Sequence, residues 1–255
     1  MSSVAEAALG EGKDFRWADS EHEGGPGVVS KAIVTDLVLP SPVPLLCPGC
    51  GEPRHHVSSK VLCWVALDRA IELAPRLGMH ADVEHWKAER EQIREAILTR
   101  GWSEAKQSYA QSFDSDDLDA AQLLMPILGF LPATDERMRS TIEAIASELT
   151  EDGLVLRYRN EEGLNADGLT GEEGTFVICT FWLVCCLAQA GEIERARELF
   201  EQLVGYASDL GLIAEEIDTK NGEQLGNFPQ AFSHIGLIVA ASNLDKARAR
   251  AKGGV

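Results

Sequence analysis

The chain has 255 residues, of which 45% are hydrophobic and 25% are charged, as in an ordinary globular domain. Acidic residues outnumber basic ones by 41 to 23, so the formal net charge is −18. This acidity argues against binding to nucleic acids or to anionic membrane surfaces, because both present phosphate groups to the protein. No apolar run reaches the ~18 to 20 residues of a membrane span, and the N-terminus lacks a signal-peptide pattern. We therefore expect a neutral or cationic small molecule as the ligand.

Three of the six cysteines lie within one apolar run at 176–190, which reads FVICTFWLVCCLAQA. They are Cys179, Cys185 and Cys186. Cysteines in such a run behave as small buried hydrophobic residues more often than as disulfide partners. Because free thiols are typical of reducing compartments, we expect a cytoplasmic protein.

A C-x-x-C motif formed by Cys47 and Cys50 precedes the first predicted helix. Together with His55, His56 or Cys63, this motif could supply four ligands to zinc. However, Cys63 falls within an apolar helix, and the second pair lacks zinc-finger spacing. We therefore expect no metal ion and no cofactor.

Residues 1–50 differ in composition from the rest of the chain. Glycine and proline cluster at 24–27 and 40–44, and a β-like pattern occurs at 31–39. These features predict a short, non-helical N-terminal arm. We expect one domain to follow at 51–255.

From residue 57 onward, the pattern predicts buried helices that alternate with amphipathic ones. The predicted buried helices cover 59–73, 118–128, 175–190 and 230–244. The predicted amphipathic helices cover 83–99, 135–149 and 192–208. Asp82 and Asp135 are expected to act as N-caps, and the basic tail from Lys246 is expected to fray.

Alternating inner and outer helices are typical of an α/α toroid, whose loops build a site at one end. A helical-repeat solenoid shows the same alternation, but with a fixed repeat length and short loops. Here the spacing is uneven, and the irregular stretch at 150–174 is long for a simple connection. We therefore expect an all-α toroid in which this stretch contributes to binding.

Two adjacent carboxylates, Glu215 and Glu216, lie in the polar loop before the last predicted helix. A predicted turn at 219–222 follows them. A loop acid held ahead of a buried helix can present a general acid or base to a cleft. The alternative interpretation is that both are solvated surface acids of an acidic protein.

Three long segments of the chain together resemble glycoside hydrolase family 15, which includes glucoamylases, glucodextranases and bacterial trehalases. They are 51–74, 168–203 and 211–238, the last reading GLIAEEIDTKNGEQLGNFPQAFSHIGLI. They occur in the family's order and correspond to the C-terminal half of its catalytic domain. Because the family fold is an (α/α)6 barrel, the resemblance implies an incomplete (α/α)6 barrel.

The resemblance also implies an activity, namely inverting hydrolysis of terminal α-glucosidic bonds of the glucoamylase or trehalase type. Inversion uses two carboxyl groups, one to protonate the leaving oxygen and one to activate water. The run Ala214-Glu215-Glu216-Ile217-Asp218 matches the family's base motif. Glu215 is therefore the expected general base, and Glu216 is an expected contact to a sugar hydroxyl. The expected partner is an α-glucoside, either trehalose or an oligosaccharide.

Four further residues are expected to bind substrate on the same resemblance. Arg157 and Tyr158 match an Arg-Tyr pair that lines the family's sugar subsite, while Glu172 and Glu173 precede the helix entry at Gly174. Taken without the resemblance, Arg157 could equally be a surface cation that pairs with nearby acids.

Three residues of the predicted buried helices are expected to be part of the core rather than of a site. They are Trp182, Phe232 and His234. We expect His234 to be a hydrogen-bonded core histidine.

The family's general acid lies in a Trp-Glu motif just before the segment that begins at Gly51. Here residues 46–50 read LCPGC, and Pro48 stands at the position of the acid. Glu52 could take that place only if the backbone were rebuilt. We therefore expect a truncated form that lacks the general acid, with residues 1–50 derived from an altered upstream reading frame. The alternatives are a non-catalytic or vestigial carbohydrate-binding α/α protein and a helical-repeat interaction module.

Overall fold

The computed structural model describes residues 54–79, 81–159 and 174–253. The expected N-terminal arm, the C-x-x-C motif, Glu172 and Glu173 therefore lie outside the described residues. The described residues form seven α-helices, one 3-10 helix and several two-residue strands. Within these ranges, no helix is both long enough and apolar enough to cross a membrane.

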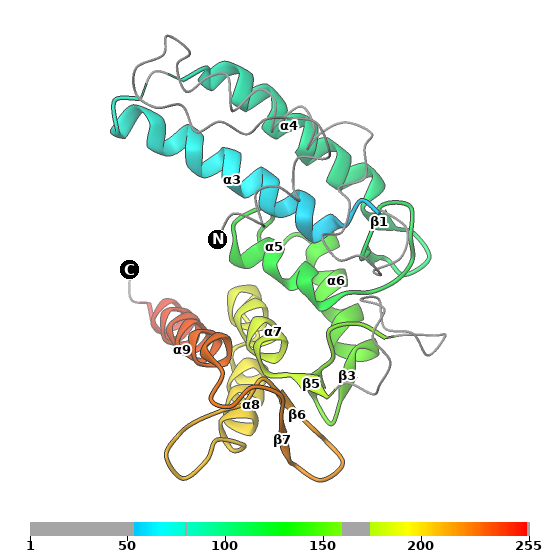
Figure 1. The fold of residues 1–255 in the computed structure, drawn as a ribbon, viewed down its shortest axis with the longest axis vertical. Coiled ribbons are helices and arrows are strands. Elements are labelled where there is room, and N and C mark those ends of the chain that lie inside the picture. Colours follow the sequence, from blue (N-terminus) through cyan, green and yellow to red (C-terminus); the bar gives the residue numbers. More distant parts are fainter. Residues whose placement is uncertain (1–53, 80, 160–173, 254–255) are drawn as a thin grey trace.

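The helices follow one another along an open arc (Figure 1). Their bounds are α3 Val57–Arg76, α4 Val83–Arg100, η1 Ala120–Leu123 (the 3-10 helix), α5 Leu124–Ile127, α6 Glu136–Glu148, α7 Val177–Ala190, α8 Ile193–Val204 and α9 Ala231–Ala251. The pair α3 and α4 packs together at one end, and α7, α8 and α9 pack together at the other. Helices α5 and α6 lie between these groups. The expected all-α arrangement of packed helices is confirmed.

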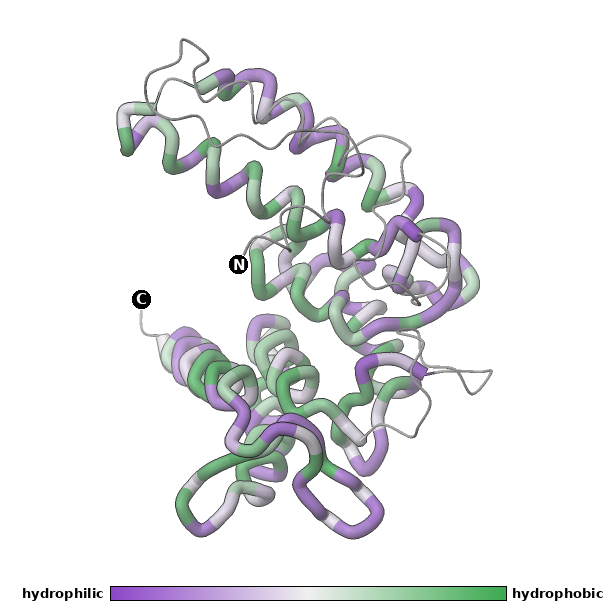
Figure 2. The backbone as a smooth tube through the Cα atoms, viewed as in Figure 1, coloured by the Kyte–Doolittle hydropathy of each residue, from purple (hydrophilic) through white to green (hydrophobic). Residues whose placement is uncertain are grey.

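Helix α7 is the centre of the core in the second half of the chain. Ten of its 14 residues are buried, and it contacts α5, α6, α8 and α9. Figure 2 shows hydrophobic residues along most of this helix. A helix that is apolar all round needs neighbours on every side, which explains why α7 lies in the middle of this group.

Helix α9 packs against α7 through a stripe of small and apolar residues. They are Ser233, Gly236, Ala240 and Leu244. At Gly236 the two helices approach so closely that an added Cβ atom would lie 3.0 Å from Cδ2 of Phe181. A second face of α9 is exposed and apolar, with Phe232, Ile235, Ile238 and Val239. The prediction of a fully buried helix is therefore wrong for α9, because no described element covers that face.

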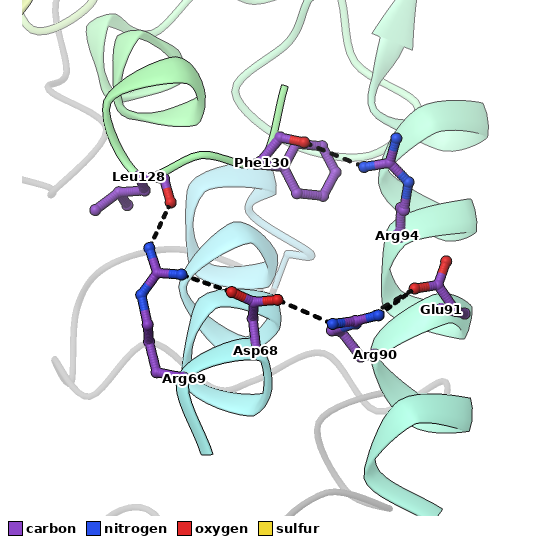
Figure 3. A network of polar contacts seen from close by, with 7 residues as sticks. All are labelled: Asp68, Arg69, Arg90, Glu91, Arg94, Leu128 and Phe130. Carbon is purple, nitrogen blue, oxygen red and sulfur yellow. Dashed lines mark hydrogen bonds and ion pairs between the residues drawn. The ribbon is translucent and has the colours of Figure 1, made fainter. Parts of the chain in front are cut away.

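A polar network fixes the α3–α4 pair against the chain that follows α5 (Figure 3). The Asp68 carboxylate on α3 accepts a hydrogen bond from Arg90 Nη1 on α4 at 2.9 Å. It also accepts one from Arg69 Nη1 at 2.6 Å. Arg69 Nη2 donates in turn to the Leu128 carbonyl at 3.0 Å. Because a guanidinium presents several donors in a rigid plane, Arg69 can hold the carboxylate and the carbonyl together.

The segment predicted as one helix at 118–128 is instead divided into η1 and α5. Asp119 has an extended backbone and accepts a hydrogen bond from the Ala121 N–H at 2.7 Å, which caps η1. Helix α5 contains Pro126 and is followed by Gly129 at a φ of 84°. Capping at one end and a left-handed residue at the other shorten the helix, although most of the segment is buried as expected.

The C-terminal tail is helical, whereas it is predicted to fray. Helix α9 continues to Ala251 rather than ending near Lys246. Arg248 and Arg250 lie in its last turn, where cations interact favourably with the negative end of the helix dipole. The basic composition that suggested fraying therefore supports the helix end.

Short strands bring the predicted site loop beside the start of α7. Strands β5 (Thr175–Phe176), β6 (Glu216–Ile217) and β7 (Gln224–Leu225) form an antiparallel sheet in the order β5-β6-β7. The predicted turn joins β6 to β7, with Gly222 at a φ of 76°. Two separate hairpins pair β1 (Trp102–Ser103) with β2 (Ser108–Tyr109), and β3 (Thr150–Glu151) with β4 (Leu154–Val155).

Candidate active site

A cavity of about 460 Å³ lies where the loop before η1, the segment after β4, α7, the Glu215 loop and the start of α9 meet. Its wall combines charged and aromatic side chains. They include Asp119, Arg157, Tyr158, Trp182, Glu215 and Phe232. An apolar pocket with a few convergent polar groups is the usual form of a small-molecule site.

Glu215 is held in this wall by its neighbours on the chain. Its Oε2 accepts hydrogen bonds from the Asn227 side-chain amide at 2.7 Å and the Asn227 backbone N–H at 3.2 Å. Its backbone N–H donates to the Asn227 carbonyl at 3.0 Å, and its carbonyl accepts from the Val177 N–H at 3.1 Å. Among the described residues, no donor bonds to Oε1. One carboxylate oxygen is thus anchored, while the other can accept a proton from water.

Gly226 allows the chain to approach the Glu215 carboxylate. It has a φ of 72°, a left-handed conformation that favours glycine. A Cβ atom at this position would lie 2.9 Å from Glu215 Oε2. A larger residue would therefore displace the carboxylate that the loop presents.

The loop is also bonded to α9 and to β7. Ser233 Oγ on α9 donates to the Ala214 carbonyl at 2.7 Å. The Ala214 N–H donates to Gln224 Oε1 at 2.6 Å, and the Gln230 N–H donates to the Ile213 carbonyl at 3.0 Å. These bonds are made by buried or half-buried groups, so they hold the Glu215 backbone firmly.

The neighbouring acid, Glu216, has a different position. Its Oε2 accepts a hydrogen bond from the Gly174 N–H at 2.9 Å. It pairs with Phe176 across the β5–β6 ladder, and it is not among the residues that line the described cavity. The structure therefore separates the two adjacent acids, since Glu215 faces the cavity and Glu216 is bonded to the entry of β5.

Arg157 and Tyr158 both line the cavity, beside each other. Arg157 Nη2 donates to the Tyr158 hydroxyl at 3.2 Å. Its guanidinium carbon lies 5.1 Å from the centroid of the Tyr158 ring and 4.5 Å from that of Phe176. Contacts with aromatic faces hold a cation in a defined orientation. Arg157 is therefore a half-buried part of the cavity wall rather than an exposed surface cation.

The three residues that are expected in the core differ in their burial. Trp182 packs against the core as expected, but it also lines the cavity. Phe232 is 64% exposed, so the expectation of a buried residue is wrong. Nδ1 of His234 lies 2.7 Å from the Gln230 carbonyl, and the residue is half-buried, which confirms the expected hydrogen bond.

Asp119 also lines the cavity, although the sequence did not single it out as a site residue. Asp119 falls inside the helix predicted at 118–128. An Asp directly before Ala-Ala-Gln is a typical N-cap pattern, and this signal could have placed Asp119 outside the helix.

No cluster of three or more His, Cys, Asp or Glu side chains that could hold a metal ion occurs within 54–79, 81–159 and 174–253. The polar groups around Glu215 and Arg157 suit a neutral polyol, which can both donate and accept hydrogen bonds. The aromatic rings beside them suit its apolar faces.

Residues 51–242 match the family model described as Glycosyl hydrolases family 15. The chain is 51% identical over 201 residues to a trehalase of Mycolicibacterium smegmatis, a match that covers 79% of this chain and 30% of that protein. It is 43% identical over 197 residues to a trehalase of Thermoplasma volcanium, covering 77% of this chain and 31% of that protein. The chain thus spans less than a third of the length of these relatives.

Solved structures share the fold at low sequence identity. A glycosidase variant in complex with glucose has a TM-score of 0.67 and 17% identity, covering 85% of this chain and 59% of that chain. A bacterial glucoamylase complexed with acarbose has a TM-score of 0.60 and 16% identity, covering 74% of this chain and 33% of that chain. The fold is an incomplete (α/α)6 barrel, and with the family match over residues 51–242 the chain belongs to glycosyl hydrolase family 15.

Proposed function

We propose that this chain forms the general-base side of a site that hydrolyses an α-glucosidic bond with inversion. The observation that carries the proposal is the Glu215 carboxylate, anchored through Oε2 by Asn227 at the wall of the cavity. In the proposed reaction, Glu215 Oε1 accepts a proton from a water molecule as that water attacks the anomeric carbon. The leaving oxygen must be protonated by a second carboxyl group, about 6.5–9.5 Å from the first.

Residues 46–50 do not supply the general acid that this mechanism needs. They contain no carboxyl group, and Pro48 stands where the family has its Trp-Glu acid. We propose that these 255 residues therefore hydrolyse a substrate with a poor leaving group only slowly. A leaving group that departs without protonation does not need the acid.

Trehalose is the substrate that we favour. Relatives named trehalase are 51% and 43% identical to this chain, whereas the glucoamylase that shares the fold is 16% identical. We propose Arg157 and Tyr158 as substrate contacts from the cavity wall. Glu216, Glu172 and Glu173 are proposed as contacts on the family resemblance alone.

We also propose that the protein is cytoplasmic. The described cysteines at 63, 179, 185 and 186 are thiols that form no disulfide bond. Burial raises the pKa of the Cys185 thiol to about 12, so this thiol stays protonated and unreactive. Unreactive free thiols are typical of proteins from reducing compartments.

The test uses α-glucosyl fluoride, because fluoride leaves without a general acid. We expect the wild-type chain to hydrolyse it, and we expect Glu215→Gln to lower the rate by about 10²–10⁴-fold through loss of the base. Glu223→Gln is a matched control, since Glu223 is exposed in the turn between β6 and β7.

Two results would count against the proposal. Equal rates for the wild-type chain and Glu215→Gln would remove Glu215 from the base role. Trehalose binding without any turnover of the fluoride would favour the alternative, a non-catalytic carbohydrate-binding protein.

A further inference from the structure

Asp119 faces the cavity from the side of η1, and its backbone is paired with the Arg157–Tyr158 segment. It forms an antiparallel bridge with Tyr158, and the Ala120 N–H donates to the Arg157 carbonyl at 2.8 Å. Residues opposite each other in an antiparallel bridge direct their side chains to the same face. Asp119 and Tyr158 both line the cavity, in agreement with this geometry.

The Asp119 carboxylate is fixed by one hydrogen bond to each oxygen. Oδ1 accepts from the Ala121 N–H at 2.7 Å, and Oδ2 accepts from Gln111 Nε2 at 3.3 Å. A carboxylate oxygen has two lone pairs, so each oxygen can accept another donor. The group is thus held in one orientation with acceptor capacity to spare.

The surroundings of Asp119 are poor in solvent. Burial raises the pKa of its carboxyl group, while the bonds from Ala121 and Gln111 and the charges of His56 and Arg157 act in the opposite direction. A charge at a largely apolar wall is costly unless donors surround it. The hydroxyl groups of a bound sugar would supply such donors.

We propose that Asp119 is a substrate-binding residue that accepts hydrogen bonds from hydroxyl groups of the glucosyl ring. It shares this wall with Arg157, so a fixed acceptor and a fixed donor face the same ligand. The proposal rests on the proposed function, because it assumes that an α-glucoside occupies this cavity. A purely structural N-cap is the competing explanation for Asp119.

Sugar analogues separate these two roles. The wild-type chain and Asp119→Asn are titrated with methyl α-glucoside and with its 2-, 3-, 4- and 6-deoxy analogues, and Kd is measured by ligand-observed NMR. Asn still caps η1, so its effect on folding is small. We expect Asp119→Asn to weaken binding of the parent sugar by about 10-fold or more, as for hydrogen bonds to charged groups. At least one deoxy analogue should bind the wild-type chain equally weakly and be unaffected by the substitution.

Asp135→Asn is the matched control, because Asp135 caps α6 through the Met138 N–H and does not line the cavity. It should leave every Kd unchanged. If Asp119→Asn does not fold, Asp119→Ser retains a capping oxygen without the carboxylate and provides the same test.

Each outcome of the titrations decides between the explanations. Equal affinity of Asp119→Asn and the wild-type chain for every sugar would overturn the assignment of Asp119 alone. An equal loss of affinity for all analogues would also overturn it, since that is the signature of a structural role. Absence of sugar binding by the wild-type chain would overturn both this inference and the proposed function.

Discussion

At the residue scale, the described site depends on how one carboxylate is held. Asn227 bonds to Glu215 Oε2 through both its side chain and its backbone, while Gly226 leaves space for that oxygen. The sequence predicted Glu215 from its motif. It could not predict the orienting role of Asn227, because Glu215 precedes β6 and Asn227 follows β7, and only the pairing of these strands brings the two residues together. Asp119 was missed for a related reason, since its cavity position follows from its bridge to Tyr158.

Asn227→Ala should lower the turnover of α-glucosyl fluoride by about 10-fold, because it removes the 2.7 Å bond that orients Glu215 and retains the backbone bond. The rate constant at saturating substrate is the measurement. Asn221→Ala, in the turn between β6 and β7 and outside the cavity wall, is the control. An unchanged rate in Asn227→Ala would show that the backbone alone positions Glu215.

His56 predicts a pH dependence of stability. Burial lowers the pKa of its imidazole, against the attraction of Asp119. Since the folded pKa lies below the unfolded value, the unfolded state takes up the proton first as the pH falls. The stabilising contribution of His56 to the free energy of unfolding is therefore fully present above pH ~6.5. It is lost progressively as the pH falls from that value through the lower pKa of the folded state.

His56→Gln should therefore reduce the fall in Tm between pH 7.5 and pH 5.5. Thermal unfolding of both proteins across this range measures the difference. Parallel Tm curves for the two proteins would contradict a depressed pKa at His56.

At the scale of elements, the sequence predicted the helices whose apolar pattern is long and whose ends carry clear signals. Asp82 and Asp135 cap α4 and α6 as expected. The strands were missed because each has two residues, too few for an alternating pattern to appear. The break of 118–128 into η1 and α5 was missed because its apolar composition continues through both pieces.

The contact between α7 and α9 is expected to tolerate little added volume. Gly236→Val should destabilise the fold by about 1–3 kcal/mol, since even a Cβ atom would lie 3.2 Å from the Phe181 Cβ. Chemical denaturation measures the change. Ser242→Val, at an exposed position of the same helix, is the control for β-branching. Equal stability of the two variants would show that the helices can separate without cost.

At the scale of the whole molecule, the helices form an open arc (Figure 1), and no element among the described residues covers one apolar face of α9. Exposed side chains on that helix include Phe232, Ile235 and Ile238. Contiguous apolar patches on monomeric proteins are uncommon and promote association. The net charge of −18 opposes association, and salt screens that repulsion. The sequence predicted an apolar helix here, but apolar composition alone could not show which face is covered.

We therefore expect the 255-residue chain to self-associate as its concentration and the ionic strength rise. Sedimentation velocity should show this, and the double variant Ile235→Lys/Ile238→Lys should reduce it. Leu210→Lys changes an exposed apolar residue away from α9 and should have no such effect. A wild-type chain that sediments as a monomer under all these conditions would contradict the expectation.

The anomeric form of the first product shows directly whether Glu215 acts as the base of an inverting hydrolysis. Proton NMR during hydrolysis of α-glucosyl fluoride distinguishes β-glucose from α-glucose before mutarotation mixes them. If Glu215 activates water on the face opposite the leaving group, β-glucose appears first. Glu215→Gln should then slow its formation by about 10²–10⁴-fold. Initial formation of α-glucose, or formation of β-glucose by Glu215→Gln at the wild-type rate, would contradict the role of Glu215 as the general base.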